Sequence, residues 1–411
     1  MIYDYIIIGG GISGLYLFYK LKKKNKDFNI LLFEKNNYFG GRIKTKYLKF
    51  NNQDYIFEEG AGRLNNYHKV FMKLIKELKL EKYLMESMSK TEFYATKNFK
   101  LKDRFKNKSF FDYIKIVLNK SKNLNKEELI NFSFGDLAKK YLNKDEIEFL
   151  KKSTGYYSRT IEMNAYDSIR LFKIGIRDDI KYYSMKLGFT KIIKELIKKI
   201  NSKKLFKNSE LKKINYNNDI FELLINNDKF KTKKLICTIP KMNLFKINYF
   251  NKYKSILNNI QTSDYCRIYA IFKKDDIWYS DYGKFTTNSH LKYVIPINKK
   301  NGLIMISYTD NINAKYWKKY LNNESKLKEK IVNDVDNIFN LKIEKPIYTK
   351  ICYWENEQNY WKPKVDSIKS SNKVMKLDKN KELYIVGEPY SETQGWIEGA
   401  LENCEKYLKK Y

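Results

Sequence analysis

The residues with the clearest chemical meaning form a glycine-rich turn near the start of the chain. Gly9, Gly11 and Gly14 follow the spacing G-x-G-x-x-G, with Ser13 before the last of them, between an apolar run and an apolar-periodic segment. At this spacing the first glycine permits a tight turn, the second lets a pyrophosphate approach the backbone, and the third lets a helix pack closely on a strand. The helix N-terminus then faces the phosphates. These residues predict a dinucleotide-binding site.

An acid and a second pair of glycines extend that prediction. Glu34 ends the next apolar run, twenty positions after Gly14, where a carboxylate accepts hydrogen bonds from the ribose hydroxyls. Gly40, Gly41 and Arg42 follow closely. Two glycines give a permissive backbone and an arginine gives a fixed positive charge, and both suit a pyrophosphate.

A third group of candidate residues lies near the C-terminus. Gly387 and Glu388 end an apolar run, and Gly395, Trp396 and Ile397 begin the last helical pattern. We expect a strand end and a helix start at these positions. They would close the predicted cofactor site from the far end of the chain.

Together these three groups resemble the flavin-containing amine oxidase family, nearest in pattern to its L-amino-acid oxidase and tryptophan oxidase branch. The last group has the family's Gly-x-x-Glu-Gly-Ala pattern. The resemblance implies FAD, and the absence of the family's flavin-linking cysteine from residues 354–363 implies that the FAD is non-covalent. It also implies that Glu388 accepts hydrogen bonds from the ribityl or phosphate side and that Trp396 faces the substrate beside the flavin. A packed core tryptophan is the alternative for Trp396.

The resemblance also implies substrate-binding residues. Gly60, which we assign to the cofactor site, opens a Gly-Ala-Gly-Arg segment similar to one in L-amino-acid oxidases. There the arginine, here Arg63, binds the α-carboxylate. The strand ending near Tyr308 resembles the one whose tyrosine shares that carboxylate, and the Gly-Tyr-Tyr at 155–157 resembles a segment of the helical domain. A guanidinium with a phenol hydroxyl suits a carboxylate. The alternative is that Arg63 pairs with a neighbouring acid or with the cofactor.

One position departs from the family pattern. Many of these oxidases carry a lysine that faces the flavin through a water, on the strand that corresponds to residues 266–269. This sequence has Arg267 there. An arginine cannot be tuned to a neutral amine, and its bulk would displace the water. We therefore expect slow reaction of the reduced flavin with oxygen.

The surrounding pattern predicts the elements that position these residues. Apolar runs at 3–8 and 28–33 enclose a helical segment at 12–24, which makes a βαβ unit. Further helices are expected at 69–80, 142–152 and 189–200 and at the C-terminus. Further strands are expected on both sides of a turn at 217–219, before 238, and at 266–272, 303–308, 348–354 and 383–386.

Composition limits the other classes of function. The formal charge of +34 is spread along the chain, so we interpret it as compositional drift toward lysine and asparagine and expect no specific nucleic acid partner. Four separated cysteines and two histidines, His68 and His290, leave no metal site or disulfide framework, and we interpret His68 and the cysteines as packing residues. No run reaches about 18 apolar residues, so no membrane span is expected. We expect a cytoplasmic protein.

We therefore predict an α/β fold: a two-domain FAD-binding Rossmann-like flavoprotein with an inserted, discontinuous substrate domain of mixed sheet and helices. The FAD-binding domain is expected at 1–66, 190–262 and 376–411, and the substrate domain at 67–189 and 263–375. The predicted reaction is oxidation of an amine, an L-amino acid by preference, through hydride transfer to the flavin. It gives an imine and then an oxo acid and ammonia, with oxygen as electron acceptor and hydrogen peroxide as product.

Several alternatives stay open. The nearest is a polyamine or monoamine oxidase, in which Arg63 has another role. A flavin-dependent isomerase or desaturase shares the N-terminal motifs. From a different class, a non-catalytic flavin-stabilised protein could use its positive charge to bind an anionic polymer. A homodimer is also left open.

Overall fold

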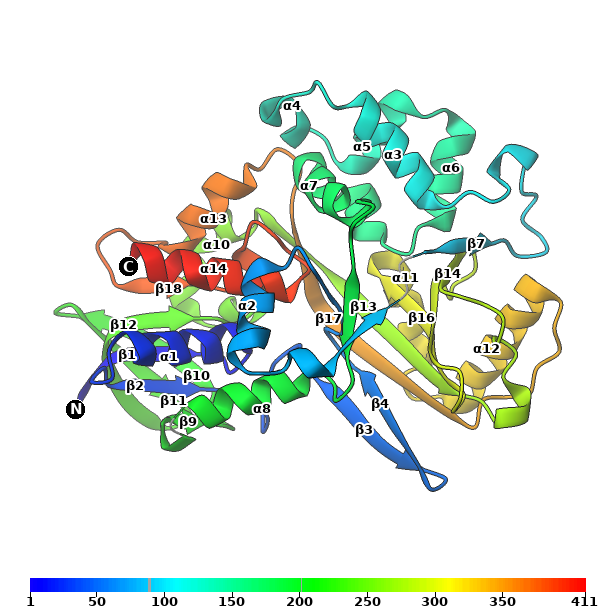
Figure 1. Cartoon of the computed structure of the whole chain (residues 1–411). Helices are drawn as coiled ribbons and strands as arrows, with labels where there is room; N and C mark the ends of the chain where they lie inside the picture. The colour runs from blue at the N-terminus through cyan, green and yellow to red at the C-terminus, as the bar shows by residue number, and fades with distance from the viewer. Residues whose placement is uncertain (88–89, 201) are drawn as a thin grey trace. The chain divides into compact units, whose positions relative to one another are not determined.

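The computed structural model describes residues 1–87, 90–200 and 202–411, and the chain divides into two compact units (Figure 1). Unit 1 consists of Met1–Glu86, Tyr183–Gln261 and Asp366–Tyr411, and unit 2 consists of Ser87–Tyr182 and Thr262–Val365. Each unit combines a sheet with helices, and the predicted α/β class is confirmed. Within the described residues, no helix has the length and apolar character needed to cross a bilayer.

Unit 1 is built around a mostly parallel sheet, because its central strands are apolar on both faces. Ile6 and Ile7 in the central strand have no exposed surface, which is typical of a parallel strand covered on both sides. The strand order is β10-β11-β12-β1-β2-β9, with β18 beside β12, and β11 alone runs opposite to the other strands of this sheet. The strands are β1 (Ile2–Ile8), β2 (Ile30–Phe33), β9 (Leu205–Phe206), β10 (Leu211–Asn217), β11 (Ile220–Ile225), β12 (Asp228–Cys237) and β18 (Leu383–Ile385).

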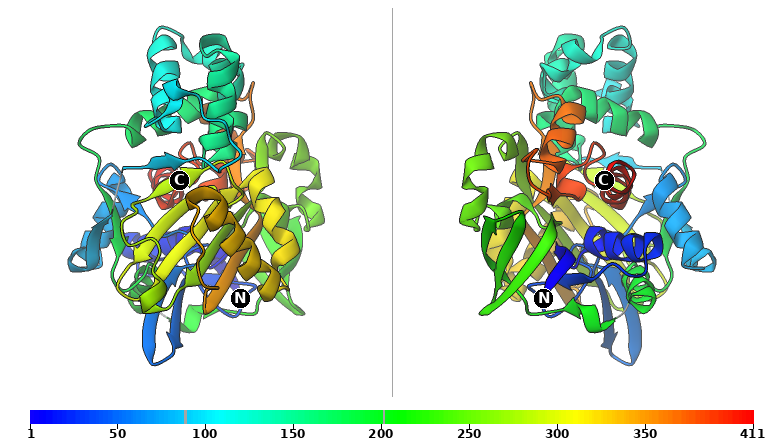
Figure 2. Two further views of the ribbon diagram at one scale, coloured as in Figure 1. Left: turned by 90° about the vertical axis from the view of Figure 1, so that its right-hand side faces the viewer. Right: turned by 90° about the vertical axis from the view of Figure 1, so that its left-hand side faces the viewer.

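Helices from four distant parts of the sequence share the core of unit 1. Leu15, Phe71, Ile193 and Leu401 each belong to a different helix, and all four pack in one cluster with Ile7 of β1. Figure 2 shows α1 and α14 near one another in both views. The helices are α1 (Ile12–Lys24), α2 (Lys69–Glu77), α8 (Thr190–Lys199), α9 (Lys241–Leu244), α10 (Lys254–Leu257), α13 (Ser367–Met375) and α14 (Ile397–Lys410). Smaller strands are β3 (Thr45–Phe50), β4 (Gln53–Glu58), β5 (Leu64–Asn65), β6 (Leu84–Ser87) and β8 (Tyr182–Met185).

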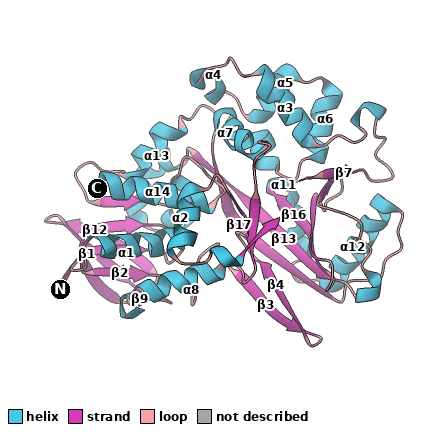
Figure 3. Cartoon of the chain, in the orientation of Figure 1, coloured by secondary structure: helices cyan, strands magenta, loops and turns pink. Residues whose placement is uncertain are grey.

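Unit 2 combines a mixed sheet with a separate group of helices, which Figure 3 distinguishes by colour. The strand order is β17-β13-β16-β15-β14-β7. These strands are β7 (Glu92–Tyr94), β13 (Ile260–Ile271), β14 (Phe285–Thr287), β15 (Tyr293–Asn298), β16 (Leu303–Asp310) and β17 (Tyr348–Trp361). The helices are α3 (Phe110–Lys120), α4 (Lys126–Ile130), α5 (Phe134–Tyr141), α6 (Lys144–Ser153), α7 (Ala165–Gly175), α11 (Asn311–Trp317) and α12 (Glu324–Phe339).

Local hydrogen bonds and backbone conformation explain where the helix boundaries differ from prediction. The prediction for 12–24 is confirmed. The helix predicted from 142 begins at Lys144, because Asn143 and Glu146 exchange side-chain-to-backbone hydrogen bonds in a capping box. The helix predicted to 80 ends at Glu77, and Lys79 adopts a left-handed conformation with φ of +57°.

Candidate flavin and substrate site

The glycine turn follows β1, where Gly11 is the N-cap of α1. Gly9 has φ of +110°, which glycine adopts readily. A Cβ on Gly14 would lie 2.0 Å from the carbonyl oxygen of Gly9, so only glycine lets α1 approach the turn this closely. A Cβ on Gly11 would meet no atom within 4 Å, and no side chain caps this helix. An open, uncapped helix N-terminus suits phosphate oxygens, so this turn fits the pyrophosphate of a dinucleotide.

Glu34 fastens the end of β2 to the glycine turn. Its carboxylate accepts hydrogen bonds from the backbone N–H of Gly10 at 2.7 Å and from the backbone and side-chain N–H groups of Asn36 at 2.8 Å. The N–H of Gly40 donates to the carbonyl of Gly10 at 2.8 Å, and Gly41 has φ of +56°. The two glycine motifs are therefore joined through the backbone. A carboxylate offers about four acceptor positions, so Glu34 can also accept a ribose hydroxyl.

Arg42 connects this region to the C-terminal motif. Its Nη1 lies 2.7 Å from Oε2 of Glu388, and the other oxygen of Glu388 accepts the N–H of Gly395 at 2.5 Å. The carbonyl of Arg42 accepts the N–H of Ala61 at 2.9 Å. A Cβ on Gly60 would lie 2.0 Å from that carbonyl oxygen. The sequence predicts that Arg42 and Glu388 act on the cofactor, and in this structure they bind each other.

The remaining residues predicted to hold the cofactor from the C-terminal side lie close to the first turn of α1. Gly387 has φ of +144°, and its N–H donates to the side chain of Asn403 at 2.9 Å. A Cβ on Gly387 would lie 3.5 Å from the hydroxyl of Ser13. Ile397, the first residue of α14, is buried in the unit 1 core. These contacts set the start of α14 beside the start of α1.

Trp396 and the segment after Arg63 lie against each other in unit 1. The rings of Trp396 and His68 make an edge contact with centroids 4.7 Å apart, and both nitrogens of His68 are within hydrogen-bonding distance of Asn65. Burial, together with the charge of Arg63, lowers the pKa of His68 to about 3, so His68 is neutral near pH 7. Trp396 is partly exposed, as is Arg63, so each keeps some surface for a ligand.

Glu398 is a positioning residue that the motif contained but the sequence analysis did not single out. It is 2% exposed, and its carboxylate accepts the N–H of Val70 at 2.9 Å and of Phe71 at 2.8 Å. It therefore caps the first turn of α2 from α14. Burial, with a smaller effect from the charge of Glu402, raises the pKa of Glu398 to about 7 against the opposing effect of backbone hydrogen bonds. The signal that could have found it was the acid in Gly-x-x-Glu-Gly-Ala.

The other two predicted catalytic residues lie in unit 2. Arg267 on β13 and Tyr308 on β16 are directly opposite partners in antiparallel strands. The guanidinium carbon of Arg267 lies 5.2 Å from the ring centroid of Tyr308 and 5.5 Å from that of Tyr265. Burial raises the pKa of Tyr308 to about 12, so its phenol stays protonated and can donate a hydrogen bond. A cation held over aromatic rings is a stable arrangement at a partly apolar site.

Asp310 binds the predicted Gly-Tyr-Tyr segment and holds it close to Tyr308. Its carboxylate accepts the N–H of Tyr157 at 2.7 Å and of Ser158 at 3.0 Å. The ring centroid of Tyr156 then lies 5.7 Å from that of Tyr308. Burial raises the pKa of Asp310 to about 6, against the opposing effect of these hydrogen bonds. No local pattern in the sequence marks Asp310 as functional, because its carboxylate accepts N–H groups from residues 152 and 153 positions earlier in the chain.

Comparison with known proteins decides the family. The profile described as flavin containing amine oxidoreductase matches residues 12–404, which is nearly the whole chain. The chain belongs to the flavin-containing amine oxidoreductase family.

Known proteins are similar to this amine oxidoreductase along nearly its full length. An uncharacterized protein of Acanthamoeba polyphaga mimivirus is 22% identical over 482 aligned residues, which cover 99% of this chain and 93% of that protein. A double mutant of putrescine oxidase has a TM-score of 0.79 at 14% identity and covers 100% of this chain and 98% of its own. Cyclohexylamine oxidase from Brevibacterium oxydans has a TM-score of 0.75 at 14% identity, with 99% and 98% covered. At these identities the two structures establish the fold.

The predicted cofactor follows from membership of this family. The amine oxidoreductase uses FAD, as the motifs indicated. The open start of α1, the carboxylate of Glu34 and the joined glycine motifs of unit 1 fit a dinucleotide of this kind. When bound, FAD supplies the two-electron acceptor for the oxidation of a substrate.

Proposed function

We propose that this amine oxidoreductase oxidises the carbon–nitrogen bond of an α-amino acid, with a preference for the L series that the sequence resemblance suggests. The observation that carries the proposal is the position of the Arg63 segment in unit 1. Its start is held by the carbonyl of Arg42, and its end, through Val70 and Phe71, by Glu398. An arginine on a segment fastened to both cofactor motifs is well suited to hold a substrate carboxylate.

The chain's own residues then bind and orient the substrate. In this proposal Arg63 pairs with the α-carboxylate, the protonated phenol of Tyr308 donates to it, and Trp396 forms a wall of the site. His68 stays neutral beside Trp396, so it adds no charge that would compete for the carboxylate. The neutral amino group is the reactive form. The substrate loses a hydride from its α-carbon and a proton from nitrogen, and water hydrolyses the imine to an oxo acid and ammonia.

A second candidate function is the oxidation of an amine without a carboxylate. It is favoured by the likeness in fold to putrescine oxidase and cyclohexylamine oxidase. In that case Arg63 serves the cofactor or an acid instead of the substrate. The two functions must be distinguished by measuring which substrate is oxidised, because one fold can support both activities.

The deciding experiment compares an amino acid with its decarboxylated amine. Each is mixed anaerobically with the FAD-bound protein, and loss of flavin absorbance is followed for wild type and for Arg63→Ala. Wild type should reduce faster with the amino acid, and the variant should lose that preference. Equal rates with both substrates in wild type, or an unchanged preference in Arg63→Ala, would contradict the amino-acid proposal in favour of the amine.

A further inference from the structure

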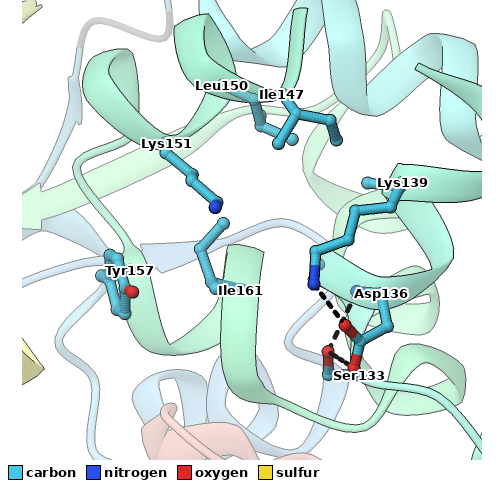
Figure 4. Close-up of a pocket in the computed structure, with 10 residues that line it drawn as sticks. Ser133, Asp136, Lys139, Ile147, Leu150, Lys151, Tyr157 and Ile161 are labelled. Atoms are coloured by element: carbon cyan, nitrogen blue, oxygen red, sulfur yellow. Dashed lines mark hydrogen bonds and ion pairs between the residues drawn. The ribbon is translucent and has the colours of Figure 1, made fainter. Parts of the chain in front are cut away.

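A cavity of about 90 Å³ opens at the surface of unit 2, between α5, α6 and the helical turn at 158–162 (Figure 4). Its apolar lining comes from Ile147 and Leu150 on α6, Ile161 on the turn, and Gly135 and Ala138 on α5. A Cβ on Gly135 would lie 2.7 Å from the carbonyl oxygen of Ile161. The glycine therefore lets α5 approach the turn and sets one wall of the cavity.

Two hydrogen-bond donors face this cavity. Figure 4 shows the ammonium group of Lys151 pointing into it from α6 and the hydroxyl of Tyr157 on the same side. Among the described residues, neither group has a hydrogen-bond acceptor. On the opposite side Lys139 lies 2.7 Å from Asp136, which also accepts a hydrogen bond from Ser133 at 2.8 Å. Lys139 is therefore paired with Asp136 by a hydrogen bond, whereas the charge of Lys151 acts on Asp136 without one and helps to lower the pKa of that carboxylate.

The two carboxylates whose charges act on Tyr157 are occupied by donors of their own. Asp310 accepts the backbone N–H groups of Tyr157 and Ser158. Glu162 accepts the side chain of Asn311 at 2.7 Å and the hydroxyl of Tyr360. Burial, with the charges of Glu162 and Asp310, raises the pKa of Tyr157, so its hydroxyl remains a donor near pH 7.

We propose that this cavity binds a small carboxylate with a short aliphatic chain. The ammonium of Lys151 and the hydroxyl of Tyr157 would bind the carboxylate oxygens, since hydrogen bonds to a charged acceptor are the stronger kind. The apolar lining would cover the chain, which removes apolar surface from water. An inorganic anion of the same charge would leave that lining without a partner. The site is separate from Arg63, which belongs to unit 1.

The experiment titrates the FAD-bound protein with butyrate, using calorimetry and saturation-transfer NMR, with propylamine and phosphate as matched probes. Butyrate should bind, propylamine should not, and phosphate should bind more weakly. Lys151→Met should weaken butyrate binding by about tenfold or more, and Tyr157→Phe by less. Lys144→Met, an exposed lysine on the same helix, should leave it unchanged. Lys151→Gln, which keeps a polar side chain, repeats the test if the methionine variant does not fold.

Titration of the Arg63→Ala variant distinguishes butyrate binding at this cavity from butyrate binding at a carboxylate site used in catalysis. Butyrate binding that persists in Arg63→Ala and weakens in Lys151→Met supports the proposal. Binding that is lost in Arg63→Ala and unchanged in Lys151→Met overturns it, while leaving the proposed oxidation of amino acids intact. Absence of butyrate binding at tens of millimolar, or phosphate binding as tight as butyrate, also overturns it.

Discussion

The candidate residues of the two units are held in different ways. In unit 1 they are joined by backbone and charged hydrogen bonds between segments far apart in sequence, such as Gly10 to Glu34 and Arg42 to Glu388. In unit 2, Arg267 and Tyr308 are neighbours on adjacent strands and lie among aromatic rings. Glycine geometry and charge pairs tolerate few substitutions, whereas an aromatic cluster tolerates several. The first arrangement therefore constrains the backbone closely, and the second leaves more room for substitution.

Replacing Gly14 should break the unit 1 arrangement most severely. The methyl group of Gly14→Ala would lie 2.0 Å from the carbonyl oxygen of Gly9, and neither backbone can move freely. We expect FAD binding to be lost and the apoprotein to unfold at a lower temperature. Gly11→Ala is the matched control, because its methyl group meets no protein atom. This variant should keep the apoprotein Tm and weaken only FAD binding, measured by fluorescence titration. Normal FAD binding by Gly14→Ala would show that the close approach is dispensable.

The coupling of Arg63 and Tyr308 tests whether both residues bind one carboxylate, as proposed. Arg63→Ala should lower kcat/KM for an amino acid by about tenfold to several hundredfold, since charged hydrogen bonds are worth about 1.5–3 kcal/mol each. Tyr308→Phe should cost less, because it removes one neutral donor and keeps the ring. In a double-mutant cycle, shared binding predicts a combined loss that differs from the product of the single losses. If the losses in kcat/KM simply multiply, the two residues do not bind the same carboxylate.

Glu398→Gln should loosen the link between the two helices that position Trp396 and the Arg63 segment. Its amide has only one oxygen to accept the N–H groups of Val70 and Phe71. We expect kcat/KM to fall by about tenfold, with FAD still bound. Lys409→Gln, at an exposed position on the same helix, is the control and should change kcat/KM little.

The free energy of unfolding of Glu398→Gln should also depend less on pH than that of wild type. The folded pKa of Glu398 is raised from 4.5 to about 7. The folded state therefore binds more protons than the unfolded state between these values, so stability falls as pH rises from about 4.5 to 7 and levels off above 7. This contribution is on the order of 3 kcal/mol. Urea unfolding at pH 5 and pH 7.5 should show a smaller decrease for Glu398→Gln than for wild type. Equal decreases would contradict the assignment.

The smallest expected effect is on the rate at which the reduced flavin is reoxidised by oxygen. Arg267→Lys restores the residue type that many of these oxidases carry, and we expect the reduced flavin of this variant to react with oxygen several-fold faster than wild type. A lysine can approach neutrality and leaves room for a water, whereas an arginine does neither. Stopped-flow mixing of reduced protein with oxygen measures the rate. A rate that is unchanged or lower in Arg267→Lys would remove the basis for this role of Arg267.

The sequence by itself determined the local elements of the predicted dinucleotide-binding motif. The turn at Gly9, Gly11 and Gly14, the helix at 12–24 and the acid at Glu34 are local, because each depends on backbone freedom or on a short spacing that can be recognised directly. The predicted FAD and family follow from the same residues. The positions of Arg63, Arg267 and Tyr308 could be marked as candidates, but their roles remain proposals.

Only the tertiary structure decided which distant residues hold each other. Glu398 caps α2 from a position 328 residues away from Val70, and Asp310 holds Tyr157 from 153 residues away. No spacing in the sequence predicts such pairs, because a buried carboxylate can accept a backbone N–H from any segment that packing brings near. The cavity at Lys151 and Tyr157 likewise depends on how three helical segments pack. Local motifs specify backbone geometry, whereas the partners of buried charges are chosen by the fold.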